Sequence, residues 1–462
     1  MLIKELGKGI LDKAPKLKKM VGPSFVLLGM GLGSGELILW PYLAANFGLG
    51  IIWAAVIGIT FQFFINMEIE RYTLVTGESV FVGLARKVKV LSPIWFILST
   101  VIPWMWPGII LSSAVVMVTV LGFGQANIVA IIMLILIGLI LSLGRVVYKT
   151  QERLQKALIF IGVPFILLLT IFLSKGSDWQ ILANGFVGKG DGFWFIPGGL
   201  SLLTFLGAFA YSGAGGNLNL AQSFYIREKE YGMGKYGGKI TSLLRKKDNK
   251  EFSLEGKKFE ISKESFRVFK DWWKKINLEH LLVFWLTGAS TIILLSLLAY
   301  VTVYKQSGDL TGINFLFKEA EGVVRMTAPV IGKIFLVLVS IMLFSTQLSV
   351  FDATSRITSE NLVIINQDKF KIKNLSKFYF FFLWLQIGLG IVILSLGFKE
   401  PLQLVTISAV LNAVTMLVYS VAVLILNQKT LDKKLRPSWW RKLILILVII
   451  FLAIFSFLVL KG

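Results

Sequence analysis

One carboxylate lies inside a long apolar stretch near the N-terminal end of the sequence. Glu36 follows the glycine-rich run Gly29-Met-Gly-Leu-Gly-Ser-Gly35, with apolar residues on both sides. A charge near the centre of a bilayer costs at least ~2.5 kcal/mol on insertion scales, and such a residue usually faces a cavity and has a partner. Three roles fit Glu36: a ligand for a cation, a proton carrier, or one half of a buried structural pair.

A second glycine-rich run, Tyr211-Ser-Gly-Ala-Gly-Gly-Asn217, lies in the middle of another apolar stretch. Each glycine inside a helix costs about 1 kcal/mol relative to alanine, so both runs predict that the helix opens locally. Open backbone at membrane depth occurs only where it is buried in protein or lines a cavity. The alternative is close helix packing through small residues four apart, a spacing that Gly29 and Gly33 share with Gly31 and Gly35.

These two runs, with a polar run in a later apolar segment, supply the candidate residues for binding a substrate or ion. They are Gly33, Ser34, Gly35, Glu36, Tyr211, Ser212, Gly213, Asn217, Asn219 and Gln347. Glu36 and Asn217 are the candidate metal ligands, because carboxylate and amide oxygens suit hard cations. An opened helix offers carbonyls to a cation and N–H groups to an anion, so the breaks alone leave the sign of the substrate open. Polar residues in the later segments also fit ordinary bundle packing.

The elements that must position these residues are membrane-spanning helices. Of the 462 residues, 55% are hydrophobic and 16% are charged, and the mean hydropathy is +0.75. This excludes a soluble or disordered protein. Eleven apolar segments are long enough to cross a bilayer: 22–48, 49–72, 91–122, 127–144, 157–174, 199–226, 279–304, 327–351, 378–398, 401–427 and 441–460. With no cysteine and one histidine, His280, thiol chemistry and a histidine metal site are excluded.

The basic residues predict the orientation of the chain. Most of the 48 Lys and Arg fall in the segments that share a side with the N-terminus if eleven spans alternate. We therefore expect a multi-pass protein of the plasma membrane with a cytoplasmic N-terminus and an external C-terminus. The net charge of +22 is then explained by loops beside anionic lipid, and no nucleic-acid module is visible.

The longest loop is the cytoplasmic insertion 227–278. Its second half spaces aromatic and aliphatic residues three to four apart among lysines and an arginine, the pattern of an amphipathic basic helix: Phe266, Phe269, Trp272, Trp273 and Ile276. We expect this helix to lie on the inner leaflet, with a gate or partner site as the alternative. Glu68, Glu70 and Arg71, at the inner end of the second span, are expected to snorkel to the surface, with an inner-gate ion pair as the alternative.

The glycine runs fall in the first and sixth spans, five spans apart. Interrupted helices at matching places in two halves are the sequence signal of a transporter with a midplane site. The chain then forms a single domain, 1–462. It has a cytoplasmic N-terminus 1–21, a first five-helix repeat 22–174, an inverted second repeat 199–427 and an eleventh helix 441–460. No catalytic motif or phosphate-binding loop is present, so we expect neither an enzyme nor an ATPase.

Several runs resemble the Nramp family of proton-coupled divalent-metal transporters. They are Gly22-Pro23-Ser24-Phe25, Asn46-Phe47-Gly48, Arg71, Val75-Thr76-Gly77, Leu206-Gly207-Ala208 through Asn217-Leu218 and, more weakly, Ser345-Thr346-Gln347-Leu348-Ser349. The resemblance implies an all-α integral membrane protein with a LeuT-like fold, two inverted five-helix repeats plus one helix, and broken helices 1 and 6.

The metal motifs of that family are replaced. Gly33-Ser34-Gly35-Glu36 stands where the family has Asp-Pro-Gly-Asn, and Tyr211-Ser212-Gly213 stands where it has Met-Pro-His. The remaining ligands are hard oxygens, which suit Mg²⁺ or Ca²⁺ better than Fe²⁺.

The resemblance therefore implies a secondary-active transporter of a divalent cation, coupled to H⁺ or Na⁺, with membrane lipids as neighbours and no bound cofactor. Two alternatives remain open. One is a transporter of a small organic solute such as an amino acid or amine. The other is a non-transporting membrane receptor or sensor that uses loop 227–278.

Overall fold

The computed structural model describes residues 5–20, 22–143, 147–237, 253–306 and 308–461, and the part of loop 227–278 at 238–252 lies outside them. Its α-helices are α1 (Pro23–Gly31), α2 (Trp40–Phe47), α3 (Ile52–Thr76), α4 (Val80–Val88), α5 (Leu91–Trp104), α6 (Gly108–Leu121), α7 (Ala126–Leu143), α8 (Val147–Leu173), α9 (Gly176–Phe186), α10 (Leu202–Ala210), α11 (Gln222–Glu228), α12 (Lys263–His280), α13 (Thr287–Val303), α14 (Asn314–Met326), α15 (Pro329–Ile365), α16 (Leu375–Ser395), α17 (Pro401–Thr430) and α18 (Trp439–Lys461).

Within these described ranges, ten helical stretches are long and apolar enough to cross a membrane. The expected sixth span, 199–226, is not among them, because its helix is interrupted between α10 and α11. The expected total of eleven spans stays a prediction. Many large apolar side chains on the outer helices are exposed, such as Phe160 on α8 and Leu396 after α16, as expected for surfaces that contact lipid.

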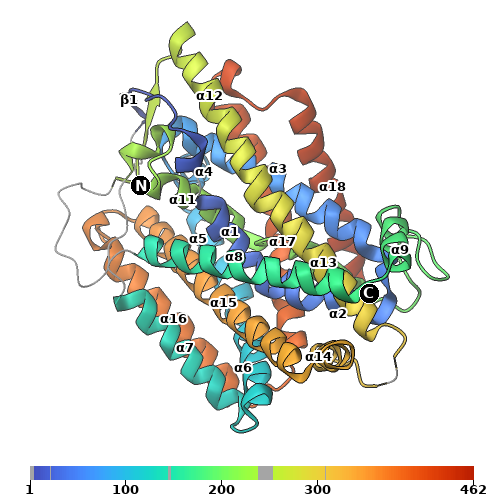
Figure 1. Ribbon diagram of the computed structural model, residues 1–462. Helices are drawn as coiled ribbons and strands as arrows, with labels where there is room; N and C mark the ends of the chain where they lie inside the picture. The colour runs from blue at the N-terminus through green and yellow to red at the C-terminus, as the bar shows by residue number, and fades with distance from the viewer. Residues whose placement is uncertain (1–4, 21, 144–146, 238–252, 307, 462) are drawn as a thin grey trace.

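The long helix α15 runs through the middle of the bundle (Figure 1). It packs against α5, α6, α16 and α1, while α10 packs against α17 and α13 packs against α2. The α1–α2 stretch is the most buried of the ten candidate spans. Residues 211–223 are buried as well, so both glycine-rich segments lie inside the protein.

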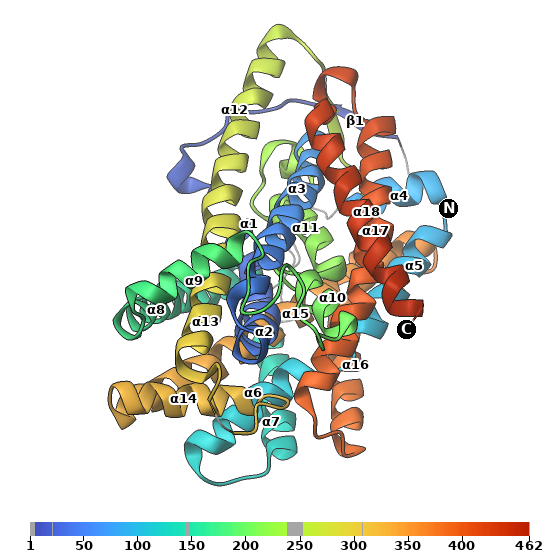
Figure 2. The same ribbon diagram turned by 90° about the vertical axis from the view of Figure 1, so that its right-hand side faces the viewer.

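The basic amphipathic helix α12 does not lie flat on a membrane surface. It continues through a π-helical turn, Leu281–Leu286, into α13, so that Lys263–Val303 forms one stretch of 41 residues (Figure 2). A helix collinear with a membrane span cannot also lie in the membrane plane, so the expectation of a surface helix is wrong. Its aromatic face packs on protein: the Trp272 indole donates to the carbonyl of Asp12 at 2.7 Å.

The N-terminal segment crosses the same end of the bundle. Strand β1 (Gly7–Gly9) pairs in parallel with β2 (Lys257–Phe259). The Tyr231 hydroxyl donates to the carbonyl of Met20, shortly before α1 begins. The segment therefore ties the start of α1 to the loop that precedes α12.

Candidate functional site

The two glycine-rich segments lie directly against each other. A Cβ atom on Gly35 would lie 1.5 Å from the carbonyl oxygen of Tyr211, and one on Gly31 would lie 2.8 Å from the carbonyl carbon of Gly213. Any larger residue would force the two backbones apart. Gly31 and Gly35 therefore act as the close-packing alternative expects, and they pack against the second glycine-rich segment, whereas Gly29 and Gly33 make room for Gln155 and Thr346.

The first segment does not unwind. Residues Leu32–Leu39 form a π-helix between α1 and α2, and the Trp40 N–H donates to the carbonyl of Gly35, five residues earlier. The wider turn keeps the backbone hydrogen-bonded, which a buried segment without water requires. The expected local opening is therefore replaced by a π-helix, a form that is common at functional sites.

The second segment is interrupted as expected. Helix α10 ends at Ala210, and a 3-10 helix, Gly216–Ala221, leads into α11. Gly215 and Gly216 have φ angles of +74° and +51°, which favour glycine. Of the described residues, Gln62 on α3 bridges the gap: its Nε2 donates to Ala210 O at 3.0 Å, and its Oε1 accepts from Gly215 N at 3.2 Å. Gln62 was not among the predicted site residues, although a glutamine inside an apolar span was the available signal.

Side chains from other helices hold the interrupted segment in place. The Tyr211 hydroxyl lies 2.7 Å from Ser408 Oγ and accepts a hydrogen bond from Asn412 Nδ2 at 2.9 Å, both on α17. Ser212 Oγ accepts from the Trp40 indole at 3.1 Å. Tyr211 and Ser212 therefore fix the backbone around the break.

Glu36 is fully buried, and neither of its carboxylate oxygens has a hydrogen-bond partner among the described residues. A Cβ atom on Gly288 of α13 would lie 3.4 Å from Glu36 Oε1 and in contact with Leu28 and Ile59. Ser34 Oγ, two residues earlier, is also buried and unpaired within this part of the chain. Glu36 thus occupies an apolar setting with no structural partner, which disfavours the buried-pair alternative.

Adjacent turns of α3 and of the helix leading into α13 contact both the surroundings of Glu36 and the second glycine-rich segment. Ile59 and Gln62, one turn apart on α3, face Gly288 and Gly213 respectively, each over short distances. Phe284, one turn before Gly288, also faces Gly213. Glu36 therefore lies near the break.

Asn217 and Asn219 use their amide nitrogens for packing and leave their oxygens free. Asn217 Nδ2 donates to Ser99 Oγ and Thr100 Oγ1, each at 2.9 Å. Asn219 Nδ2 donates to the Tyr419 hydroxyl at 2.7 Å. Both Oδ1 atoms are buried without a partner in the described part of the chain. Within the described chain, the fully buried atoms without a partner on the predicted site residues are thus the oxygens of Ser34, Glu36, Asn217 and Asn219.

The polar run around Gln347 has mainly a packing role. Thr346 Oγ1 donates to Gly29 O at 2.9 Å. A Cβ atom on Gly33 would lie 2.5 Å from the same Thr346 Oγ1. Ser345 and its neighbour Ser349 both accept from Gln155 on α8. Gln347 itself is 3% exposed, and no hydrogen bond joins it to Glu36 among the described residues.

A metal site of several strong ligands is not present in the described ranges, where no group of three or more His, Cys, Asp or Glu could hold an ion. At the C-terminal end of α3, Glu68 is paired with arginines, whereas the ion pairs of the described residues join Glu70 only to His280. Glu68 binds Arg71 at 2.7 Å and Arg441 at 3.4 Å, and all three are buried. The expectation that this cluster snorkels to the surface is wrong, because Arg71 is 5% exposed, donates to Leu435 O between α17 and α18, and lies over the Trp273 ring of α12.

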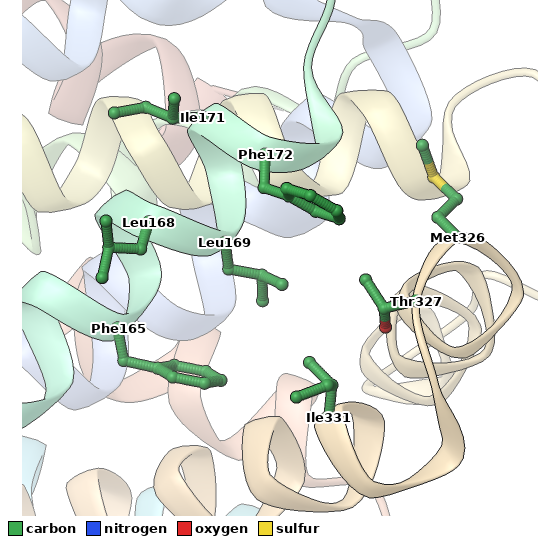
Figure 3. A pocket seen from close by; sticks show the side chains of 8 residues that line it. All are labelled: Phe165, Leu168, Leu169, Ile171, Phe172, Met326, Thr327 and Ile331. Carbon is green, nitrogen blue, oxygen red and sulfur yellow. The ribbon is translucent and has the colours of Figure 1, made fainter.

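One groove of about 730 Å³ lies away from these residues, between α8 and the α14–α15 turn (Figure 3). Its lining is apolar except for one hydroxyl: Phe165, Leu168, Leu169, Ile171, Phe172, Met326, Thr327 and Ile331. No predicted site residue reaches it, so the groove is not part of the candidate site.

Comparison of the structure with solved structures identifies the fold, although the sequence itself has no match. No family model and no curated protein matches the sequence. The structure is similar to the crystal structure of a mutant Eremococcus coleocola manganese transporter, with a TM-score of 0.70, 14% identity and coverage of 98% of this chain and 89% of that one. The same transporter in complex with an aromatic bis-isothiourea substituted compound gives a TM-score of 0.66, 15% identity and the same coverage. The chain therefore has the LeuT-like all-α fold of membrane transporters.

Proposed function

We propose that this chain is a secondary-active transporter that moves a divalent metal cation through a site between its two glycine-rich segments. One observation carries the proposal. Ser34 Oγ, both Glu36 oxygens and the Oδ1 atoms of Asn217 and Asn219 are buried without partners among the described residues. Each such atom costs roughly 1–3 kcal/mol when left unpaired, and a bound cation would remove that cost.

Each site residue has a role in this proposal. Glu36 supplies the charge that compensates the cation, and Asn217 supplies a neutral oxygen. Gly35 allows the two backbones to approach, Gly33 makes room for Thr346, and Gly213 makes room for Gln62 and Phe284. Tyr211 and Ser212 anchor the break to its neighbours. The ligands are hard oxygens, which suit Mg²⁺, Ca²⁺ or Mn²⁺ better than soft metals.

The likeness to a manganese transporter supports this assignment. We infer a divergent, Nramp-related protein of the plasma membrane, with repeats 22–174 and 199–427, a cytoplasmic N-terminus and H⁺ or Na⁺ as the coupling ion. Alternating access then follows from the movement of one repeat against the other.

Thermal stabilisation of the purified protein tests the proposal. Mg²⁺, Ca²⁺, Mn²⁺, amino acids and amines are added in turn to the parent, to Glu36→Gln and to Glu319→Gln. Glu319 is the matched control, because it is buried on α14 with an unpaired Oε1 within the described chain. We expect a metal at one hundred times its Kd to stabilise the parent and the control by about 2.7 kcal/mol, seen as a higher melting temperature, and to leave Glu36→Gln unchanged. Equal stabilisation of Glu36→Gln contradicts the proposal.

A small organic solute such as an amino acid is the second candidate, and Trp104 favours it. The Trp104 ring stacks on Tyr211 with centroids 5.5 Å apart, and its indole N–H is buried without a partner in the described residues. This donor could bind a carboxylate while Glu36 binds an ammonium group. Stabilisation by an amino acid, lost in both Glu36→Gln and Trp104→Phe while metals are inert, would select this candidate.

A further inference from the structure

A second group of buried ionisable residues lies where α1 begins. Glu279, near the end of α12, accepts hydrogen bonds from Gly22 N at 3.3 Å and from Ser24 Oγ at 2.5 Å. His280 Nδ1 lies 2.8 Å from Ser24 Oγ and 3.2 Å from Glu70 Oε1 on α3. We call Glu70, Glu279 and His280 the closure cluster, because their contacts join three helices at one end of the bundle.

The closure cluster holds two carboxylates and no permanent cation. Glu70, Glu279 and His280 are 1%, 4% and 0% exposed. No ion pair among the described residues joins a Lys or Arg to either carboxylate; Lys156, whose charge acts on Glu279, and Lys229 pair with Glu152 at 2.6 and 2.9 Å. Two buried negative charges without a cation are strongly unfavourable, so one of the groups takes up a proton.

Unpaired atoms point to the same conclusion. Glu70 Oε2 and His280 Nε2 are buried without partners among the residues described. Each of these two atoms can therefore bind a proton without losing a hydrogen bond. The His280 ring is held between Phe63 and Phe284, with centroids 5.5 and 4.7 Å away. The imidazole is therefore fixed beside Ser24 and Glu70, and a proton can be shared across the cluster.

We propose that Glu70, Glu279 and His280 form a proton-binding site that holds the start of α1 against α3 and α12. The proton is bound while this end of the protein is closed. When the end opens and water enters, the carboxylates are hydrated and the proton leaves. The closed form then binds one more proton than the open form, so opening becomes easier as pH rises, by up to tenfold per pH unit.

Other ionisable groups face the cluster and set its surroundings. They come from α8, from the end of α11 and from the loop after it: Tyr148, Glu152, Lys156, Glu228, Lys229 and Tyr231. The proposal does not depend on the cargo or on Glu36, and its test measures closure instead of transport.

The absence of cysteine from the sequence makes a direct test available. Met20 is fully buried just before α1, so Met20→Cys places a single thiol that reacts only when this end opens. The labelling rate is measured from pH 5 to 8 in the Met20→Cys background and again with Glu70→Gln or Glu279→Gln added. Glu319→Gln is the matched control, and Lys263→Cys, at an exposed position, gives the pH dependence of a thiol itself.

We expect labelling of Met20→Cys to rise with pH more steeply than that of Lys263→Cys, by up to tenfold per unit. Glu70→Gln and Glu279→Gln should lose this extra slope, and Glu319→Gln should keep it. Identical profiles for Met20→Cys and Lys263→Cys, or an extra slope that survives both glutamine substitutions, would overturn the proposal. If a substituted protein does not fold, hydrogen exchange of residues 22–31 in the unmodified chain decides: protection beyond the intrinsic pH effect must increase as pH falls.

Discussion

Asp352 and Glu36 are both fully buried carboxylates on membrane-spanning helices, but their surroundings differ. Both carboxylate oxygens of Asp352 lie 3.0 Å from Arg356 Nε and share its one N–H, and Oδ1 also accepts from the Tyr379 hydroxyl at 2.7 Å. Arg356 also binds Glu228 at 2.7 Å. Glu36 has no such partner in the described chain.

The difference separates two uses of a buried charge. A carboxylate that is enclosed with its own cation holds helices together, as Asp352 joins α15 to α16 and, through Arg356, to α11. A carboxylate that is enclosed without a cation is compensated only when something else binds. The number of partners therefore distinguishes structure from binding better than burial does, since both residues are equally buried.

The largest effect is expected where a pair is broken. Arg356→Met leaves Glu228 and Asp352 without the guanidinium that each of them contacts, and such a loss costs about 3–5 kcal/mol. The free energy of unfolding in detergent, measured with denaturant, should fall by that amount. Lys318→Met, in an exposed pair with Glu321, is the control and should change it by less than about 1 kcal/mol. Similar losses in the two variants would remove the distinction.

The contact between the two glycine-rich segments is the next test. Gly35→Ala places a methyl group 1.5 Å from Tyr211 O and should destabilise the protein by about 1–3 kcal/mol, because the backbones must separate. Gly388→Ala on α16 meets nothing within 4 Å and should be neutral or slightly stabilising. The melting temperatures of the two variants are compared. Equal values would show that the close contact between the two glycine-rich segments is not required for stability.

Glu36 and Asp352 should respond in opposite directions to neutral substitution. Without added ligand, Glu36→Gln removes a buried charge that lacks a partner and should raise the free energy of unfolding by about 1–2 kcal/mol. Asp352→Asn should lower it, because Arg356 loses a charged partner. Parallel denaturant titrations measure both, and a loss in Glu36→Gln as large as that in Asp352→Asn would place Glu36 among the structural carboxylates.

The smallest effect concerns Glu319 on α14, outside the ten candidate spans. Burial raises the pKa of this carboxyl well above its usual range. Its stabilising contribution is therefore complete below the pKa of the unfolded chain and is lost as pH rises towards the pKa of the folded state. Relative to Glu319→Gln, the parent should lose about 1.4 kcal/mol for each unit between the two pKa values. Parallel stability curves from pH 4 to 8 would contradict this.

Hydropathy and glycine spacing were enough to predict the helical membrane fold and the interruption at Tyr211–Asn217, because both follow from local composition. The behaviour of the first glycine run could not be predicted in the same way. Its backbone stays helical because Gly31 and Gly35 pack on the second segment, a contact between residues far apart in the chain. A close approach of this kind removes the space that an unwound segment would need.

The sequence predicted which residue types form the candidate site, but it did not predict most of the contacts between them. Glu36 was conspicuous because a charge is rare among apolar residues. Gln62 was missed, and its role depends on carbonyl and amide groups of another helix that the sequence alone does not bring together. The surface orientation predicted for α12 failed for a related reason. The partner of its apolar face is the N-terminal segment, more than 240 residues earlier.

That tie to the N-terminal segment has a consequence for how the protein is made. The backbone N–H of Gly22, at the entrance to α1, finds its partner 257 residues later at Glu279. Chains are synthesised at about 5–20 residues per second, so α1 waits roughly 10–50 s on the ribosome before its partner emerges. The start of α1 is therefore fastened to α12 only after more than half of these 462 residues have been translated.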